Sequence, residues 1–544
     1  MGGMRRIAAV TAALALAAGG CGGDKPTGGD RGSAVDTRAT APSNTGDLDR
    51  VQRARAAAAE AAWRRAELAR IADSPTVPAA LRRALLTRAI TPRAHDRYRA
   101  AYAGAHTAAR RLGGARRAEE AAVLASVQRL AAERRLTPSR LPAVFLNLRR
   151  NTRTWTQAPF PRASERRSFG AHPAVFQYVP GHGMQLHPLA TWGQLNGKLR
   201  RCLYTRGEDC RKRALRRKVD ALGRLAARRG RFLAWEYYYA YAQGTPPWMS
   251  GMAQATAVQA LSRAAIALGA RRYTRLARRA LGAFETPPPA GVAVPAAGGR
   301  RYVMYSFAPA LQILNGELQA VNGLRDAAVL GRSARAARLV ARGDRAARVA
   351  LGGFDTGAWS LYSAAGAEST FSYHHLTTGI LAELCRRTER AEYCRANRRF
   401  AHYEREPPRI GIAPLHGLYA RRSAPLRFTL SKGSAVQVRV FGPEGVALAR
   451  DLQLGRGAHD LHWTPPTRGR FRVHVQARGP EGKLGSSDRT VSVVHPKPRP
   501  KPKREARRPR PERRGEAGEP KREARPPRPE RLGEAGEPTR GGLG

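Results

Sequence analysis

The sequence predicts a multidomain, mainly α-helical protein. A helical segment and a small β region lead into an (α/α) toroid, which is followed by an immunoglobulin-like β-sandwich and a disordered tail. Two long stretches, 48–150 and 199–408, carry apolar residues at helical spacing. The period changes to two after residue 409, and the last segment, 495–544, is dominated by Pro, Arg and Glu. A chain of 544 residues is long enough for several domains with cores of their own.

The strongly basic charge bears on the class of binding partner. Lys and Arg number 97 against 41 Asp and Glu, which gives a formal net charge of +56. Such an excess is typical of proteins that bind polyanions. The basic residues are 87 Arg and 10 Lys, however, and they are spread over nearly every segment instead of forming one stripe. Nucleic-acid binding is therefore not favoured.

The amino terminus has the pattern of a secretory signal. Two arginines precede the apolar run 7–18, and small residues then lead to Cys21. This resembles a bacterial lipoprotein signal, so we expect a signal peptide at 1–21, lipidation of Cys21 and an extracytoplasmic protein anchored to the cell membrane. Ala18 stands where such signals usually have Leu, which leaves plain cleavage and secretion open. Residues 22–47, rich in Gly, Thr, Ser and Asp, are expected to be a flexible linker.

The segment before the toroid divides into two parts. Residues 48–150 are expected to be helical, as the spacing of Leu81, Leu85 and Ile90 illustrates. Residues 151–198 instead place aromatic side chains among Pro and Gly, which is typical of a small β-rich region. Neither part carries a motif for chemistry.

Two histidines in this β-rich region are candidate metal ligands. His182 and His187 are five residues apart in a predicted loop, and no carboxylate accompanies them. A metal site usually needs three or four such ligands. We therefore interpret both as loop residues and expect no metal site.

Residues 199–408 are expected to form the toroid, and together with the β-rich region they make one domain, 151–408. Aromatic and Gly-rich loops separate the helical runs, and in toroids such loops at one end hold the site. The predicted helices are 215–227, 232–242, 252–268, 273–284, 309–324, 327–351, 377–388 and 391–403.

Four cysteines remain after Cys21, and they fall into two local pairs. In an oxidising compartment, this spacing favours two short-loop disulfides. A four-cysteine zinc site is the alternative, although it usually has closer pairs. The predicted disulfides are Cys202–Cys210 and Cys385–Cys394.

The region 409–494 reads as a β-sandwich of short strands. Apolar residues alternate in runs such as 426–430 and 470–477, and turn residues separate the runs. Five to seven such strands predict an immunoglobulin-like fold. After it, 495–544 contains a tandem repeat whose Pro, Arg and Glu content predicts an extended disordered tail.

Four short motifs in the helical region resemble one family, the D-glucuronyl C5-epimerases that act on heparan-type polysaccharides. Their order and approximate spacing match the C-terminal catalytic domain of that family. The motifs are PWMSGMAQA at 247–255, YVMY at 302–305 with LNG at 314–316 and VNGL at 321–324, FDTG at 354–357 with Leu361 and Tyr362, and YHHLTT at 373–378.

The resemblance implies an isomerase that inverts C5 of D-glucuronate in a polysaccharide to give L-iduronate. It implies no cofactor, an acidic uronic-acid polysaccharide as partner, and a homodimer as the assembly to test. The C5 proton lies beside a carboxylate, so its removal needs a base on one face, an acid on the other and cations for the carboxylate. A tyrosine has a pKa near 10, and neighbouring cations must lower that pKa for it to act as a base.

The resemblance also assigns site residues by position. Tyr373 and Tyr362 correspond to the main proton-transfer candidates, with Tyr305 beside them. The residues taken as substrate contacts are His374, Trp248, Gln254 and Asn315.

One departure from the family pattern leaves two further functions open. Val303 and Met304 stand where the family has paired glutamates, and neither can move a proton. Loss of an acid/base group costs about 10²–10⁴-fold in rate. Two acids that could take their place are Glu236 and Glu317, which the sequence alone does not position in the cleft. The alternatives are a catalytically impaired surface lipoprotein that binds acidic glycans, and a uronan lyase.

Overall fold

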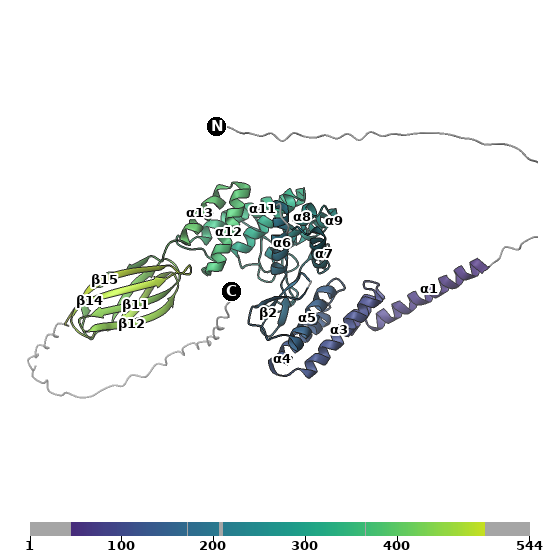
Figure 1. Ribbon diagram of the computed structural model, residues 1–544, viewed down its shortest axis with the longest axis horizontal. Helices are drawn as coiled ribbons and strands as arrows, with labels where there is room; N and C mark the ends of the chain where they lie inside the picture. The colour runs from purple at the N-terminus through teal and green to yellow at the C-terminus, as the bar shows by residue number, and fades with distance from the viewer. Residues whose placement is uncertain (1–44, 171, 206–209, 365, 496–544) are drawn as a thin grey trace, which may run out of the picture. The chain divides into compact units, whose positions relative to one another are not determined.

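The computed structural model describes residues 45–170, 172–205, 210–364 and 366–495 (Figure 1). The chain divides into two compact units, Met1–Glu67 and Leu68–Gly544. The predicted signal peptide with Cys21, nearly all of the predicted linker and the predicted tail lie outside the described residues. Within the described ranges, no helix combines the length and apolar character needed to cross a membrane.

The amino-terminal part of the described chain is helical, as the spacing predicts. The long helix α1 (Thr45–Arg70) is followed by four helices with a shared core. Threonines cap two of these helices and are followed by a proline in the first turn, a combination that favours helix initiation. The four are α2 (Val77–Leu86), α3 (Pro92–Arg111), α4 (Gly114–Ala132) and α5 (Leu141–Gln157).

A small antiparallel sheet comes next, in the order β1 (Arg166–Ser168), β2 (Val175–Val179) and β3 (Gly183–Leu186). Side chains of α5 hold it in place. Asn151 Oδ1 accepts from the Met184 amide at 2.7 Å, and Asn147 Oδ1 accepts from the Leu186 amide at 2.8 Å. These buried amides fix β3 against the helices, which in turn positions β1.

The helical region that follows packs in pairs: α6 with α8, α8 with α10, α10 with α11 and α12, and α12 with α13. The helix α8 is buried on nearly every side. A Cβ on Gly323 would lie 2.5 Å from the Ala255 carbonyl oxygen, so the two helices meet closely there. A closed toroid remains a prediction. The bounds are α6 (Pro188–Tyr204), α7 (Lys212–Gly223), α8 (Gly251–Ala267), α9 (Arg271–Ala280), α10 (Leu314–Val329), α11 (Ala334–Ala350), α12 (Phe371–Thr388) and α13 (Ala391–Tyr403), with short 3₁₀ turns at Leu281–Phe284 and Leu351–Phe354.

The helix predicted at 232–242 was wrong. This segment is extended: β4 (Ala227–Arg229) pairs with β5 (Phe232–Ala234), and Tyr237 then forms an isolated bridge with Trp248. Aromatic side chains at alternate positions favour extended backbone, because it places them on one face. A second hairpin, β6 (Ala293–Ala296) and β7 (Gly299–Tyr302), precedes α10.

Both predicted disulfides are confirmed. Each pair has its Cα atoms 4.8 Å apart and its sulfur atoms at bonding distance. Because each cysteine bonds within its own pair, the zinc alternative does not hold for the four cysteines. The Cys385–Cys394 bridge joins α12 to α13.

The carboxy-terminal strands form two sheets around one apolar core. The sheet orders are β13-β10-β8 and β12-β11-β14-β15-β9. Buried and exposed positions alternate along the strands, as the period of two predicts. An immunoglobulin-like topology remains a prediction. The strands are β8 (Ile410–Ile412), β9 (Leu418–Tyr419), β10 (Ala424–Leu430), β11 (Ser434–Gly442), β12 (Gly445–Leu454), β13 (Gly457–Trp463), β14 (Gly469–Arg478) and β15 (Leu484–Val494).

Candidate active site

Three tyrosines from separate parts of the chain meet in one cluster. Tyr305 follows β7, Tyr362 lies in the loop before α12, and Tyr373 lies in the first turn of α12. The rings of Tyr362 and Tyr373 have centroids 4.8 Å apart, and Tyr305 and Tyr362 lie close enough for each hydroxyl to shift the pKa of the other. A fourth member, Tyr241, has its ring centroid 5.5 Å from that of Tyr305. We call these four residues the tyrosine cluster.

The members of the cluster are half-buried, which distinguishes them from the core tyrosines beside them. Tyr237 and Tyr239 are buried, and they support Trp248. The Trp248 indole stacks on Tyr237 at 4.1 Å between centroids and donates from Nε1 to the Tyr239 carbonyl at 2.9 Å. It also contacts Tyr305 at 5.9 Å between centroids. Trp248 therefore forms the aromatic floor beneath the tyrosine cluster.

Tyr241 joins the cluster because the chain around it is extended. Residues two apart on extended backbone share a face, so Tyr237, Tyr239 and Tyr241 all turn towards Trp248. The sequence interpretation of this stretch as a helix hid that alignment. The alternation of aromatic residues at 235, 237, 239 and 241 was the signal that could have revealed it.

The tyrosine hydroxyls differ in acidity. Burial raises the pKa of Tyr362 to about 12, while the hydrogen bond from Tyr305 acts in the opposite direction. Burial and the neighbouring tyrosines hold the pKa of Tyr305 far above its usual range. Tyr362 is therefore the member of the pair that ionises more readily.

The positive charge of Arg166 acts on this cluster. Burial raises the pKa of Tyr373, and the positive charge of Arg166 acts against this rise. Burial raises the pKa of Tyr237, and the charge of Arg166 opposes this rise; burial lowers the pKa of His187, and the charge of Arg166 adds to this fall. Arg166 lies on β1, opposite Gln177 of β2, whose Oε1 accepts from its Nε at 3.0 Å. No local signal in the sequence separates Arg166 from the other arginines of the chain.

His374 is placed differently from the expectation that it binds substrate. It is fully buried, and its ring stacks on Trp359 at 3.8 Å. Its Nδ1 lies 2.7 Å from Ser360 Oγ, and its Nε2 lies 3.0 Å from the Phe400 carbonyl oxygen. Both ring nitrogens are therefore occupied, and His374 holds α12 to α13. The adjacent His375 is exposed and contacts Glu404 instead.

The two predicted amide contacts also separate. Gln254 is fully buried, and its amide binds both the N–H and the C=O of Trp235, at 3.1 and 2.7 Å. Gln254 thus positions the backbone of Trp235, which precedes the residues that support Trp248, and both ends of its side-chain amide are already hydrogen-bonded. Asn315, in the first turn of α10, is buried, and its Oδ1 has no hydrogen-bond partner within the described chain. Asn315 therefore keeps an unsatisfied acceptor.

The positions of the two missing glutamates are filled by packing. Val303 is buried, and its backbone pairs with Gly251 and Val292. Met304 packs on α10, with its sulfur 3.5 Å from Ser250 Oγ and close to Gly316. Neither position offers a carboxylate, as the sequence indicated.

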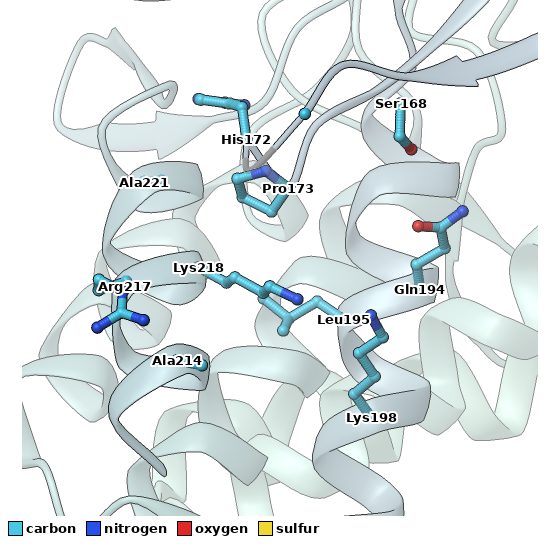
Figure 2. Close-up of a pocket in the computed structure, with 11 residues that line it drawn as sticks. Ser168, His172, Pro173, Gln194, Leu195, Lys198, Ala214, Arg217, Lys218 and Ala221 are labelled. Carbon is cyan, nitrogen blue, oxygen red and sulfur yellow. The ribbon is translucent and has the colours of Figure 1, made fainter. Parts of the chain in front are cut away.

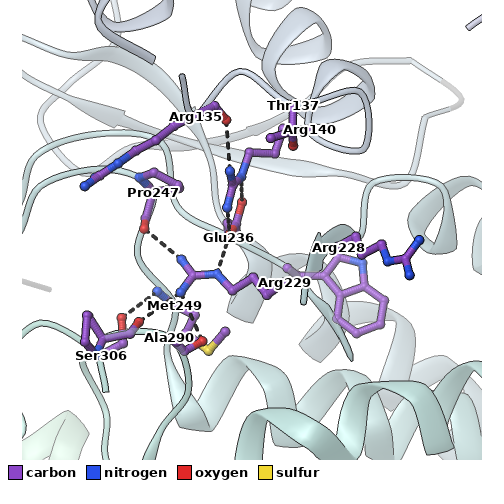
Figure 3. Close-up of polar contacts among 12 residues, drawn as sticks. Arg135, Thr137, Arg140, Arg228, Arg229, Glu236, Pro247, Met249, Ala290 and Ser306 are labelled. Carbon is purple, nitrogen blue, oxygen red and sulfur yellow. Dashed lines mark hydrogen bonds and ion pairs between the residues drawn. The ribbon is translucent and has the colours of Figure 1, made fainter. Parts of the chain in front are cut away.

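The two nearby acids have different environments. Glu236 is buried between Arg140 and Arg229, which hold its pKa below the usual value despite burial (Figure 3). Glu236 therefore stays ionised, and the two arginines neutralise its negative charge. Burial raises the pKa of Glu317 to about 7, against the effect of Gln312 and Arg301. Glu317 is thus a carboxyl that changes charge near neutral pH.

Comparison with known families covers the part of the chain that holds the tyrosine cluster. No curated protein matches the chain. A family model described as D-glucuronyl C5-epimerase C-terminus matches residues 229–402. This range includes all four tyrosines and Trp248, but not Arg166. Residues 229–402 are thus similar to the C-terminal domain of the D-glucuronyl C5-epimerases, and the resemblance indicated by the motifs is confirmed over this range.

Proposed function

We propose that this protein is a carbohydrate epimerase that inverts C5 of D-glucuronate residues in a polysaccharide to give L-iduronate. One observation carries the proposal: Tyr305, Tyr362 and Tyr373 meet in a half-buried cluster on which the charge of Arg166 acts, within a segment similar to the epimerase family. The family similarity supports a carbohydrate epimerase. The glucuronate substrate and the residue roles are our inference from the cluster.

The reaction moves one proton off C5 and another onto the opposite face. The ionised tyrosine of the pair Tyr362 and Tyr373 takes the C5 proton, and the electron pair moves into the adjacent carboxylate to form an enediolate. The second tyrosine, still protonated, delivers its proton to the other face of C5 and becomes the phenolate. Charge and protons balance, and the enzyme is left ready for the reverse direction.

Four side chains support these steps. The Arg166 guanidinium binds the substrate carboxylate and stabilises the negative charge that develops on it. Tyr305 donates its hydrogen bond to the phenolate of Tyr362. Trp248 provides the apolar floor for a sugar ring, and Asn315 offers its free carbonyl oxygen to a sugar hydroxyl. His374 and Gln254 act through the fold, because their polar atoms are already bonded.

The acidity of the cluster limits the rate. With a pKa of about 12, Tyr362 is ionised in about one molecule in ten thousand at pH 8. A glutamate that assisted the proton transfer would relieve this limit, and Met304 does not. This specific observation favours the second candidate function, a surface protein that binds acidic glycans with little or no turnover.

The cellular setting of the proposal remains that predicted from the amino terminus. We propose an extracytoplasmic protein held to the membrane through a lipid on Cys21, with secretion as the alternative. The two disulfides support an oxidising compartment. The C-terminal strands, proposed as an immunoglobulin-like domain, serve as a spacer or a binding module.

Proton NMR of an unsulfated glucuronan incubated with the protein in D₂O tests the proposal. Incorporation of deuterium at C5, at a rate that falls by about 10²–10⁴-fold in Tyr373→Phe and in Tyr362→Phe, supports the proposal. Tyr204→Phe is the matched control, since Tyr204 is 65% exposed at the end of α6. Binding of the polymer without exchange would favour the glycan-binding function. A new ultraviolet-absorbing C4–C5 double bond would identify a lyase.

A further inference from the structure

A basic cavity lies between the loop after β1 and the helices α6 and α7. Its volume is about 670 Å³, and it opens to solvent. Figure 2 shows the residues around it, all of which precede the segment 229–402 that matches the epimerase family. Those that matter for binding are Ser168, His172, Gln194, Lys198, Arg217 and Lys218.

The most unusual feature of this cavity is a pair of lysines. Lys198 comes from α6, and Lys218 reaches towards it from α7, as Figure 2 shows. Burial and the positive charge of Lys198 lower the pKa of Lys218. The chain has only ten lysines, and two of them point into one space although like charges repel.

The residues that line this cavity include no acid to neutralise the pair. Asp220, also on α7, is already bonded to Arg272 at 3.0 Å and to the Tyr273 hydroxyl at 2.9 Å. Two ammonium groups that face each other without a carboxylate are stabilised when an anion enters between them.

The remaining polar groups of the cavity suit an anion as well. Burial and the surrounding arginines lower the pKa of His172 to about 4, so its ring is neutral at physiological pH. Its Nδ1 accepts from the Ala174 amide at 3.2 Å, which leaves the proton on Nε2. His172 is therefore a donor like the two lysines, and Arg217 adds a third charge.

Two elements that line the cavity, β1 and α6, also reach residues that act on or support the tyrosine cluster. Ser168 lies two residues after Arg166 on β1, so both are on the same face of the strand, about 7 Å apart. On α6, the Leu189 amide lies 3.4 Å from the Tyr237 hydroxyl, and Lys198 follows nine residues later, about 14 Å along the helix. The cavity and the residues beside the tyrosine cluster are thus connected through β1 and α6.

We propose that this cavity is an accessory subsite for a carboxylate or sulfate group of an acidic polysaccharide. It would hold a sugar residue away from the one that reacts. The identity of the polymer rests on the proposed function, whereas the preference for an anion rests on the lysine pair alone.

Calorimetric titration with glucuronan oligosaccharides tests the subsite. The double variant Lys198→Gln/Lys218→Gln is compared with Lys212→Gln, which removes an exposed lysine of α7 that does not line the cavity. We expect the double variant to raise Kd by about tenfold or more and Lys212→Gln to change it less than twofold. Because removing like charges relieves repulsion, the double variant is expected to fold, and its thermal midpoint checks this.

The outcomes separate the subsite from the proposed function. Binding that depends on the lysine pair without C5 exchange upholds the subsite and overturns the epimerase. If C5 exchange occurs and glucuronan binding is the same in the double lysine variant, the epimerase is upheld and the subsite is overturned. A titration with inorganic sulfate, read from ¹³C-methylated lysines, adds a further arm. If sulfate changes the chemical shift of methylated Lys218 while the double variant binds glucuronan as tightly as the unaltered protein, the cavity is a site for small anions and the polysaccharide assignment is overturned.

Discussion

Replacement of Glu236 by glutamine should strongly destabilise the protein. The Glu236 side chain is fully buried, and it accepts from Arg140 Nε at 2.7 Å and Nη2 at 2.9 Å (Figure 3). Arg229 Nε binds the other side of the same carboxylate, and the Tyr238 hydroxyl lies 3.2 Å from it. The guanidinium groups of both arginines are largely buried, with side chains 12% and 11% exposed. Glu236→Gln keeps the volume but leaves two buried cations without a counter-charge.

The expected loss is about 3–5 kcal/mol in the free energy of unfolding, the usual effect of removing one partner from a buried ion pair. Urea unfolding followed by tryptophan fluorescence measures it. The control is Glu285→Gln, which breaks an ion pair with Arg335 whose side chains are 40% and 43% exposed. That change should cost about 0–1 kcal/mol. A loss below about 1 kcal/mol in Glu236→Gln would show that solvent reaches the arginines, and the reasoning would fail.

Three further predictions follow from particular contacts. Gly323→Ala should lower the free energy of unfolding by about 1–3 kcal/mol, because the new Cβ would lie too close to the Ala255 carbonyl oxygen. Gly379→Ala, where the Cβ would meet open space on α12, should raise it by about 0.5–1 kcal/mol. Thermal unfolding of both variants measures these changes. Burial lowers the pKa of His187 to about 4, so on acidification the unfolded chain binds a proton at this residue before the folded chain does. The free energy of unfolding should therefore fall by about 2–3 kcal/mol between pH 6.5 and 4. Urea unfolding of a His187→Asn variant, which keeps a side chain able to cap α6, should lack this part of the pH dependence. The rate of C5 exchange should rise about tenfold per pH unit from pH 8 to 10, because the pKa of Tyr362 lies near 12; a flat profile would exclude a tyrosine base that must ionise in the free protein.

Local sequence patterns determined most of the secondary structure. Helical spacing located α8, α9 and α13 to within a few residues, since their apolar positions recur with the period of the helix itself, whereas α12 begins six residues before the predicted start at Thr377. The spacing of the cysteines was enough for both disulfides, because each bridge closes a loop of fewer than ten residues. The motifs were likewise local, and they correctly indicated the family similarity of residues 229–402.

Only the tertiary structure decided which polar groups meet. Tyr305 and Tyr362 come from two loops and Tyr373 from the first turn of α12, and their contact depends on how α10 and α12 pack. His374 and Tyr373 are adjacent in sequence, yet one turns into the core and the other to the cluster, because successive residues of a helix point about 100° apart. Arg166 reaches the site from a separate sheet. Sequence periodicity reports which face of an element is buried, but the partner of that face is set by long-range packing, and a catalytic cluster consists of such partners.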